Sequence, residues 1–378
     1  IVVGQLQLHQ SNHGIVDDAF EFIRDPIPYA LFSQLLNGSD ALGFDKDLID
    51  DRYGTKDTPG CAVIVCLFKE DRCGCFDRLI VLMIGGRHVV GSNLPSSKIT
   101  KAPMFSLTST GRMLDLQEPV VMGIINCTPD SFYSGSRVLQ TEQGLLFAEE
   151  QVRQGARVLD LGGQSTRPGS TRITAKEERD RVIPLLSAIR QKHPALFLSV
   201  DTFYAEVAQA AIDAGADMIN DISAGTIDPS IRQVAAHSGL PYVLMHMRGT
   251  PQDMKSHTTY EHVTRDVVQF LQREIDACRQ AGIDQLVLDP GIGFAKKVDQ
   301  NFQLLRELNE LNTLSLPILI GVSRKSMIYK TLDVDPMLAL NGTTALHMFA
   351  LMQGANLLRV HDVRAAWETI RLFNQLQS

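Results

Sequence analysis

Eight short apolar runs of this sequence each close on polar or charged side chains that could do chemistry. One such residue most often caps or solvates the end of an element, but eight run ends in one chain make that explanation improbable. The set combines carboxylates, amides and cations, which suits a polar heterocycle bound together with an anion. In chain order the residues are Asn126, Asp160, Asp201, Asn220, His246, Asp289, Arg324 with Lys325, and Arg359 with His361.

Three of these side chains are equipped to hold a nitrogen-rich ring by its donor edge. Asp201, Asn220 and Asp289 offer acceptors and one amide. A buried carboxylate is costly unless a donor meets it. The two aspartates therefore imply either an internal partner or a guanidine-like ligand.

Other run ends supply positive charge and a candidate metal site. Lys325, Arg359 and His361 close the last two runs and would meet an anionic group. Asn126, with Asp160 near it, could hold Mg²⁺, a hard ion that prefers oxygen ligands and often shares phosphate oxygens with the protein. Zinc fits less well, because no Cys/His trio converges there.

The stretch DLGGQSTRPG (160–169) follows the second run and gathers flexible backbone, hydroxyl groups and a cation in one place. A simple connector would need only a turn signal. This composition suits an anion or a polar heterocycle, and the loop alone does not distinguish between them.

A repeated pattern from about residue 105 onward indicates the elements that position these side chains. Helical stretches end at Gly155, Gly215, Gly282 and Gly354, where a helix C-terminus favours a left-handed residue. The apolar runs that follow are rich in Val, Ile and Leu, as in parallel strands buried on both faces. They lie at 119–126, 157–163, 196–202, 218–223, 242–247, 286–293, 318–324 and 356–362.

Eight βα units in about 270 residues predict an α/β fold of the TIM (β/α)₈ barrel type, with the active site at the carboxyl ends of the strands. An open doubly wound sheet is the alternative, but it usually carries a glycine-rich dinucleotide motif after the first strand, and none is present. We expect the barrel over 105–378 and leave 1–104 as an unassigned extension, whether accessory, disordered or spurious.

Composition narrows the class of partner. Over 378 residues, 44% are hydrophobic, and the net charge of -7 argues against a general nucleic-acid binder. No apolar stretch is long enough to span a membrane and no secretory signal is visible, so we expect a cytoplasmic protein. Four of the six cysteines, Cys61, Cys66, Cys73 and Cys75, lack zinc-site spacing and are interpreted as reduced structural thiols.

Eight motifs, one at the end of each predicted strand, resemble those of the dihydropteroate synthase family. They are INCTPDSF (125–132), DLGGQSTRPG (160–169), SVDT (199–202), INDIS (219–223), MHMRGTP (245–251), DPGIGFAK (289–296), GVSRKS (321–326) and RVHD (359–362). The resemblance covers about 105–378. It implies a TIM barrel that joins (7,8-dihydropterin-6-yl)methyl diphosphate to 4-aminobenzoate, releasing diphosphate and forming 7,8-dihydropteroate for folate synthesis.

The resemblance also implies a role for each matching residue. Asn126 is expected to bind Mg²⁺, with Asp160 acting through water. The expected pterin-binding residues are Asp201, Asn220, Asp289 and Lys325, and the expected diphosphate anchors are Arg359 and His361. Diphosphate departure would leave a cationic methylene stabilised by the pterin, which the aniline nitrogen then attacks. Family members of this kind imply small-molecule substrates and a homodimer.

The loop after the second strand is implied to be a mobile lid. Thr166, Arg167 and Pro168 would close over the 4-aminobenzoate site with Ser326, and Thr166 would also contact the pterin diphosphate. Lys325, Arg359, His361 and Arg167 are the expected catalytic residues. Gln164 departs from the glutamate that is common in the family, which affects only the loop's hydrogen bonding.

Two other functions share this barrel. One is a pterin-binding methyltransferase that acts on methyl-tetrahydrofolate, which would not be expected to carry the STRPG, SRKS and RVHD motifs together. The other is a non-catalytic pterin-binding homologue, which loss of Asn126, Lys325 or Arg359 with His361 would have indicated; all are present. Cys127 lies beside the site and is interpreted as a packing residue rather than a nucleophile.

Overall fold

The computed structural model describes residues 81–84, 87–90, 105–128, 137–166 and 169–377. The chain divides into two compact units, Ile1–Thr100 and Lys101–Ser378. In the first unit, strands β1 (Val81–Ile84) and β2 (Arg87–Val90) form an antiparallel hairpin with Val81 opposite Val90. The four clustered cysteines lie outside the described residues.

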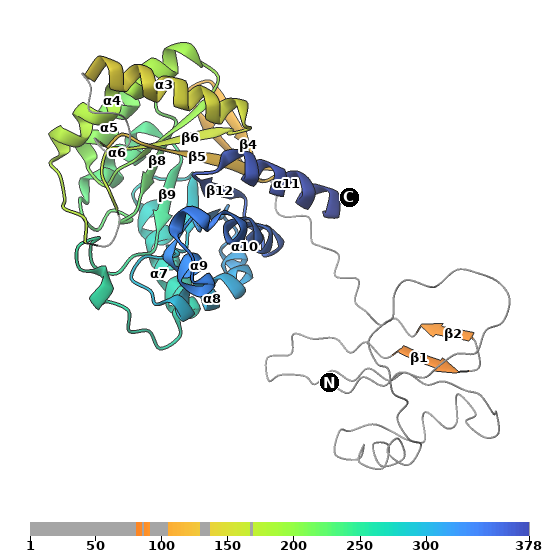
Figure 1. Cartoon of the computed structure of the whole chain (residues 1–378). Coiled ribbons are helices and arrows are strands. Elements are labelled where there is room, and N and C mark those ends of the chain that lie inside the picture. The colour runs from red at the N-terminus through yellow and green to blue at the C-terminus, as the bar shows by residue number, and fades with distance from the viewer. Residues whose placement is uncertain (1–80, 85–86, 91–104, 129–136, 167–168, 378) are drawn as a thin grey trace. The chain divides into compact units, whose positions relative to one another are not determined.

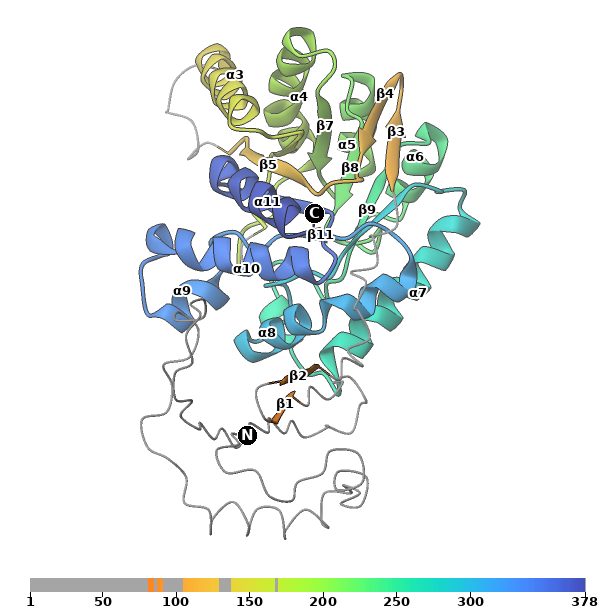
Figure 2. The ribbon, with the colours of Figure 1, turned by 90° about the vertical axis from the view of Figure 1, so that its right-hand side faces the viewer.

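The second unit is a parallel eight-stranded barrel with helices around it (Figures 1 and 2). The strands are β5 (Val120–Asn126), β6 (Val158–Gly162), β7 (Phe197–Asp201), β8 (Met218–Asp221), β9 (Tyr242–Met245), β10 (Leu286–Asp289), β11 (Leu319–Ile320) and β12 (Leu357–Val360). Their order is β10-β9-β8-β7-β6-β5-β12-β11. The ring closes where Leu288 bridges Ile318, and the Leu288 N–H donates to the Pro317 carbonyl at 2.8 Å. The predicted TIM barrel is confirmed.

Helices alternate with these strands in the order that the sequence predicts. They are α3 (Arg137–Arg153), α4 (Ala175–Lys192), α5 (Ala205–Asp213), α6 (Ser230–Ser238), α7 (Val263–Gln280), α8 (Val298–Arg306), α9 (Ser326–Leu332), α10 (Leu340–Met352) and α11 (Val363–Gln377). Both α9 and α10 lie between β11 and β12, with the 3₁₀ helix η4 (Pro336–Leu338) between them.

The predicted glycines follow helix ends with positive φ angles: 110° at Gly155, 100° at Gly215, 88° at Gly282 and 103° at Gly354. At Gly155 a side chain would also collide with the Trp367 ring, because an added Cβ would lie 2.4 Å from Trp367 Cδ1. Glycine is therefore required there for two reasons.

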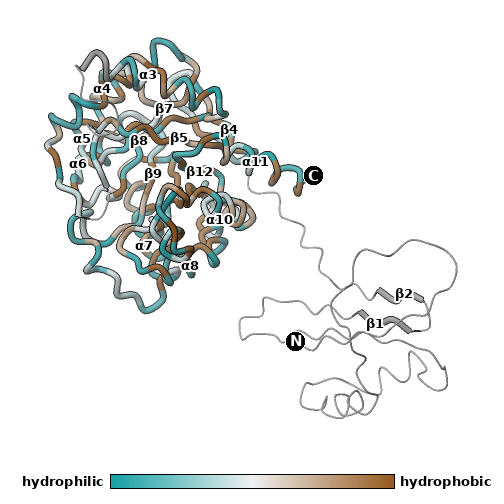
Figure 3. The backbone as a smooth tube through the Cα atoms, in the orientation of Figure 1, coloured by the Kyte–Doolittle hydropathy of each residue, from teal (hydrophilic) through white to brown (hydrophobic). Residues whose placement is uncertain are grey.

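The core consists of the strands and the helix faces that pack on them, and Figure 3 shows the strands coloured mainly as hydrophobic. At the amino ends of the strands, the barrel is plugged by a hairpin that the sequence analysis missed. Its strands are β3 (Ser106–Ser109) and β4 (Arg112–Asp115), joined at Gly111 with a φ of 73°. Its Leu107 and Leu114, with Leu116 just beyond it, pack against the first buried residues of the barrel strands.

The hairpin is held by polar contacts as well. Ser109 Oγ and Arg112 Nε each donate to the buried Asp217 Oδ1 at 2.6 Å, and Arg190 from α4 pairs with the other oxygen. The amino end of the barrel is thus closed by packing and ion pairs. A ligand would therefore enter the barrel at its carboxyl end.

Candidate active site

The strand register brings the predicted residues together at the carboxyl end of the barrel. Asn126 of β5 lies opposite Gly162 of β6, Gly162 opposite Asp201 of β7, and Asp201 opposite Asn220 of β8. Asn126 is exposed, whereas Asn220 is buried. Asn126, Asp201 and Asn220 therefore share one level of the barrel mouth, whereas Asp160 lies two residues deeper on β6, opposite Ile124 and Ser199.

Arg359 connects strands that lie far apart in the sequence. Its Nε donates to Asp160 Oδ2 and its Nη2 to Asp201 Oδ2, both at 2.6 Å. Arg359 is on β12, whereas the two aspartates are on β6 and β7, so the guanidinium reaches across the barrel interior. Within the described part of the chain its Nη1 makes no hydrogen bond, which leaves donors for a ligand.

Asp160 accepts hydrogen bonds from three side chains of the site. Besides Arg359, it accepts a hydrogen bond from Ser199 Oγ at 2.6 Å and one from Asn220 Nδ2 at 3.0 Å. Its side chain is fully buried. Asp160 thereby fixes the orientation of Asn220 and Arg359, which had not been expected from the sequence.

Burial leaves the mouth with unfavourable negative charge. It raises the pKa of Asp201 to about 7, because the Arg359 guanidinium offsets only part of the desolvation and Asp160, Asp221 and Asp289 repel a further charge. Burial also raises the pKa of Asp289, against the opposing effect of Lys325. A ligand that presents several N–H donors would relieve this excess.

Asp289 and Lys325 both make hydrogen bonds to the loop between β10 and α8. Asp289 Oδ1 accepts from the Gly291 N–H at 2.7 Å. Lys325 precedes α9 and donates from Nζ to the Ile292 carbonyl, with its ammonium 4.8 Å from the Phe294 ring centroid. Burial lowers the pKa of Lys325 to about 8, although Asp289 favours the charged form. This lysine can therefore exchange a proton near neutral pH.

The last two strand ends carry one exposed histidine and one arginine held in an ion pair. His361 is exposed, and its Nδ1 lies 3.0 Å from Ser323 Oγ. Arg324 makes two hydrogen bonds to the Asp362 carboxylate at 2.8 and 2.7 Å, so it ties the β11 and β12 loops together. Ser326 is the first residue of α9.

The loop after β6 is tied at its base. Gln164 Oε1 accepts from the Ile173 N–H at 2.9 Å, and a glutamate could accept the same bond. Gly169 N donates to the Pro251 carbonyl at 3.0 Å. Thr166 is half-buried, and Arg167 and Pro168 lie outside the described residues.

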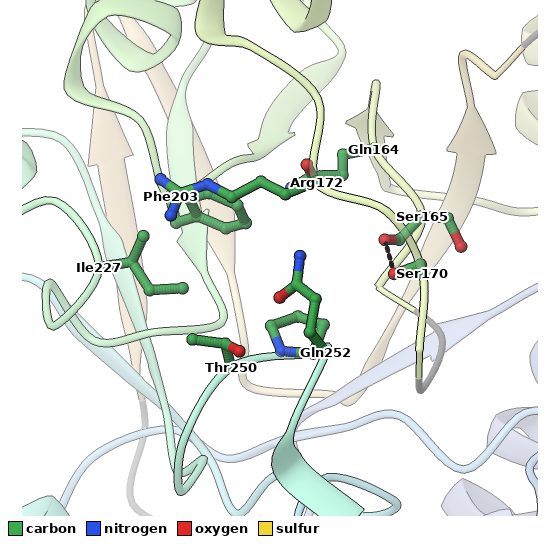
Figure 4. A pocket seen from close by; sticks show the side chains of 9 residues that line it. Gln164, Ser165, Ser170, Arg172, Phe203, Ile227, Thr250 and Gln252 are labelled. Carbon is green, nitrogen blue, oxygen red and sulfur yellow. Dashed lines mark hydrogen bonds between the residues drawn. The ribbon is translucent and has the colours of Figure 1, made fainter.

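A pocket opens beside this loop (Figure 4). Arg172 lies over the rings of Phe203 and Tyr204, 4.9 and 4.8 Å from their centroids. The lining comes from the loops after β6, β7, β8 and β9: Gln164, Ser165, Ser170, Arg172, Phe203, Ile227, Thr250, Pro251 and Gln252. None of the residues expected to hold the pterin lines it, so this pocket is separate from them.

His246 closes β9, but its side chain does not belong to the exposed mouth. The ring is buried, and its Nδ1 lies 2.9 Å from Nζ of Lys296. Lys296 was missed in the sequence analysis. Its position at the end of the DPGIGFAK motif, on the loop after a strand, could have indicated that it matters for the site.

The oxygen donors fit a magnesium ion delivered by a phosphate ligand better than one held by the protein alone. Among the described residues, no cluster of three or more His, Cys, Asp or Glu side chains could hold a metal. Both Asp160 oxygens already accept hydrogen bonds, whereas the Asn126 side chain is exposed at the mouth. Asn126 is thus the direct candidate, with Asp160 reaching an ion only through water.

Cys127 is buried, and burial raises the pKa of its thiol to about 12. A thiol with so high a pKa is a poor nucleophile, which agrees with its interpretation as a packing residue.

In the described part of the chain, no helix has the length and apolar character needed to cross a membrane.

Comparison with known proteins places these features among pterin-binding enzymes. The sequence model of the pterin binding enzyme family matches residues 122–361. The dihydropteroate synthase of Synechocystis sp. is 45% identical over 259 residues, covering 68% of this chain and 89% of the relative. That of Escherichia coli is 42% identical over 268 residues, covering 70% and 94%.

Solved structures agree with the sequence relatives. Yersinia pestis dihydropteroate synthase in a sulfonamide complex superposes with a TM-score of 0.68 at 42% identity, covering 72% of this chain and 99% of that one. Xanthomonas albilineans dihydropteroate synthase with 4-aminobenzoic acid gives 0.68 at 41% identity over 73% and 99%. The same enzyme with 7,8-dihydropteroate gives 0.66 at 38% identity over 72% and 99%.

Proposed function

The chain belongs to the dihydropteroate synthases of the pterin-binding enzyme family, and we propose that its barrel mouth joins (7,8-dihydropterin-6-yl)methyl diphosphate to 4-aminobenzoate. The products are 7,8-dihydropteroate and diphosphate. The observation that carries this assignment is the set of acceptors formed by the half-buried Asp201 and the buried Asn220 and Asp289, beside Lys325 and Arg359. Structures of relatives with 4-aminobenzoic acid and with 7,8-dihydropteroate support both the substrate and the product.

The proposed mechanism uses each group for one task. Asp201, Asn220 and Asp289 bind the donor edge of the pterin. Lys325 and Arg359, with His361 at the rim, offset negative charge as the bond between the methylene carbon and the diphosphate oxygen breaks. The aniline nitrogen forms the new carbon–nitrogen bond with the cationic methylene and releases one proton to solvent. Asn126 would hold a magnesium ion, which would supply further neutralisation of the charge on the departing diphosphate.

The proposal assigns the loop around Thr166, Arg167 and Pro168, together with Ser326, to 4-aminobenzoate. All of these residues lie within 105–378, and we propose that this part carries the chemistry. The buried free thiols Cys127 and Cys278 support work in a reducing compartment, and we place it in the cytoplasm.

Growth of a bacterium that lacks its own dihydropteroate synthase tests the assignment in cells. The full chain should restore growth without added folate products, and the Asp289→Ala variant should not. A chain that was a methyltransferase or a non-catalytic homologue would fail to restore growth even when well expressed.

Removing the proposed metal ligand should weaken the second substrate rather than the first. For Asn126→Ala we expect roughly tenfold or greater loss of 4-aminobenzoate binding measured with diphosphate and Mg²⁺ present, because the ion would be held by the diphosphate alone. Binding of a pterin analogue without diphosphate should stay near the wild-type value. Calorimetry on both ligands checks this, and an equal loss of both would contradict the metal role.

An apolar surface supports a homodimer. Exposed hydrophobic residues gather on the neighbouring elements α9, η4, α10 and α11 (Figure 2): Leu332, Met337, Leu338, Leu340, Phe349, Met352, Leu372 and Leu376. Helix α10 contains no charged residue. A surface of this kind marks an interface, and an uncharged helix face can pair with its own copy about a twofold axis. We therefore propose that a second copy of the chain covers it.

A charge placed on this surface should separate the copies. Met352→Glu, at a side chain that is 66% exposed, is expected to shift the mass in solution from dimer to monomer, because the glutamate would be buried without a partner. Leu146→Glu on α3 is the matched control, since Leu146 is 64% exposed and lies on a different helix. Light scattering measures the mass in solution. A monomeric wild type, or a Met352→Glu variant that stays dimeric, would contradict the proposal.

A further inference from the structure

The loop between β10 and α8 has a strained backbone. Gly291, Gly293 and Ala295 have φ angles of 68°, 85° and 49°, so left-handed residues occupy alternate positions. Gly291 also has no room for a side chain, since an added Cβ would lie 2.0 Å from the His246 carbonyl oxygen. Ala295 carries a Cβ in this unfavourable region. Such a backbone persists only where surrounding contacts fix it.

Two lysines provide those contacts through the carbonyl groups of the loop. Lys296 donates from Nζ to Gly291 O at 2.9 Å and to Phe294 O at 3.1 Å. Lys325, from the next strand end, donates to the carbonyl of Ile292, which lies between those two residues. Three carbonyl groups of the loop, those of Gly291, Ile292 and Phe294, therefore accept hydrogen bonds from two lysine side chains that come from different segments.

Lys296 is held in a costly environment. Its side chain is buried, its third partner is Nδ1 of His246 at 2.9 Å, and among the described residues it makes no ion pair with a carboxylate. Burial lowers the pKa of Lys296 well below its ordinary value, although Asp289 opposes this effect, and burial likewise lowers the pKa of His246. An apolar side chain of similar size would fill the same space without this penalty. The lysine must therefore contribute something that packing alone does not.

We propose that Lys296 is a positioning residue that fixes the β10–α8 loop so that Asp289 and Lys325 are correctly placed for the pterin. This inference rests on the proposed function. The connection runs through Gly291, whose carbonyl accepts from Lys296 and whose N–H donates to Asp289 Oδ1 at 2.7 Å. It also runs through Ile292, whose carbonyl lies inside the turn that Lys296 closes and accepts from Lys325. Lys296 touches no substrate in this scheme and acts through these two residues.

The test compares the same substitution at neighbouring positions of the full chain. Lys296→Met removes the buried hydrogen bonds, and Lys297→Met removes the same charge from the exposed neighbour. We expect Lys296→Met to raise the KM for the pterin diphosphate and the Kd for a pterin analogue by roughly tenfold or more, with kcat changed much less. Lys297→Met should match the wild type in all three. A purely structural loss would reduce the active fraction, and so kcat, without changing KM or Kd.

The outcomes separate this inference from the function on which it rests. Wild-type binding of the pterin with equal Kd values for Lys296→Met and Lys297→Met would overturn the positioning role alone. A wild type that binds no pterin would overturn the proposed function and the inference with it. Should Lys296→Met fail to fold, Lys296→Leu takes its place, because it likewise leaves the Gly291 and Phe294 carbonyls without their side-chain donor. A Kd for Lys296→Leu equal to that of Lys297→Met would then overturn the inference.

Discussion

Replacing Asp289 by alanine is expected to weaken pterin binding by roughly 100-fold or more, because a hydrogen bond to a charged group contributes about 1.5–3 kcal/mol and a guanidine-like edge offers two donors. Asp289 is buried at the end of β10, and Lys325 is the charged group that most favours the ionised form of its carboxyl. Calorimetric titration with a pterin analogue measures the loss.

The control for this variant is Asp284→Ala. Asp284 is exposed and precedes the same strand at its other end, so the change in net charge is identical while the mouth is untouched. We expect wild-type affinity for this control. Near wild-type affinity in Asp289→Ala would mean that the pterin binds elsewhere.

Replacing Arg359 by methionine is expected to reduce turnover by roughly 1000-fold and to destabilise the fold by about 3–5 kcal/mol. The substitution leaves the buried carboxylates Asp160 and Asp201 without their shared cation. It also removes the guanidinium that would stabilise the departing diphosphate. The exposed Arg364→Met, which breaks only a surface pair with Glu368, should change stability by at most about 0.5 kcal/mol.

The destabilisation should depend on pH in a defined direction. The pKa of Asp201 is already raised to about 7 with Arg359 present, and removing the cation raises it further. Below pH 7 the carboxyl is protonated in both proteins, so its share of the deficit is absent. Above pH 7 the carboxyl ionises beside Arg359 in the wild type, whereas the variant must either keep it protonated or bury it as an uncompensated charge. The deficit should therefore grow as pH rises through about 7.

Thermal melts from about pH 5.5 to about pH 8.5 check this dependence. The double variant Arg359→Met with Asp201→Asn should lose most of the pH dependence, because the titrating group is gone. A deficit that stayed constant over this range would show that the ion pair does not account for the loss.

The barrel could be predicted because its strands are local patterns. Runs such as 242–247 and 286–293 are apolar up to the polar residue near their end, since both faces of a parallel strand are covered, and each preceding helix ends at a glycine such as Gly282. The strand-end residues follow from the same pattern. Asp201 and Asn220 lie opposite each other because consecutive strands are neighbours in the sheet.

Partners across the barrel could not be predicted in this way. Arg359 pairs with Asp160 across 199 positions of the sequence, and no local pattern records which strand end faces which. His246 directly follows β9 and Arg324 lies four residues beyond β11, on the side of the barrel that the sequence predicts. Arg324 is nevertheless bound to Asp362, and His246 is buried beside Lys296. The β3–β4 hairpin was missed although the turn at Gly111 was visible, because a closed barrel does not itself require a plug.

The most direct test of the central claim is the stoichiometry of the reaction catalysed by the purified full chain. With (7,8-dihydropterin-6-yl)methyl diphosphate, 4-aminobenzoate and Mg²⁺, we predict one 7,8-dihydropteroate formed for each diphosphate released, and no product when Asp289→Ala replaces the wild type. Diphosphate release without dihydropteroate, or methyl transfer from methyl-tetrahydrofolate with no condensation, would contradict the account.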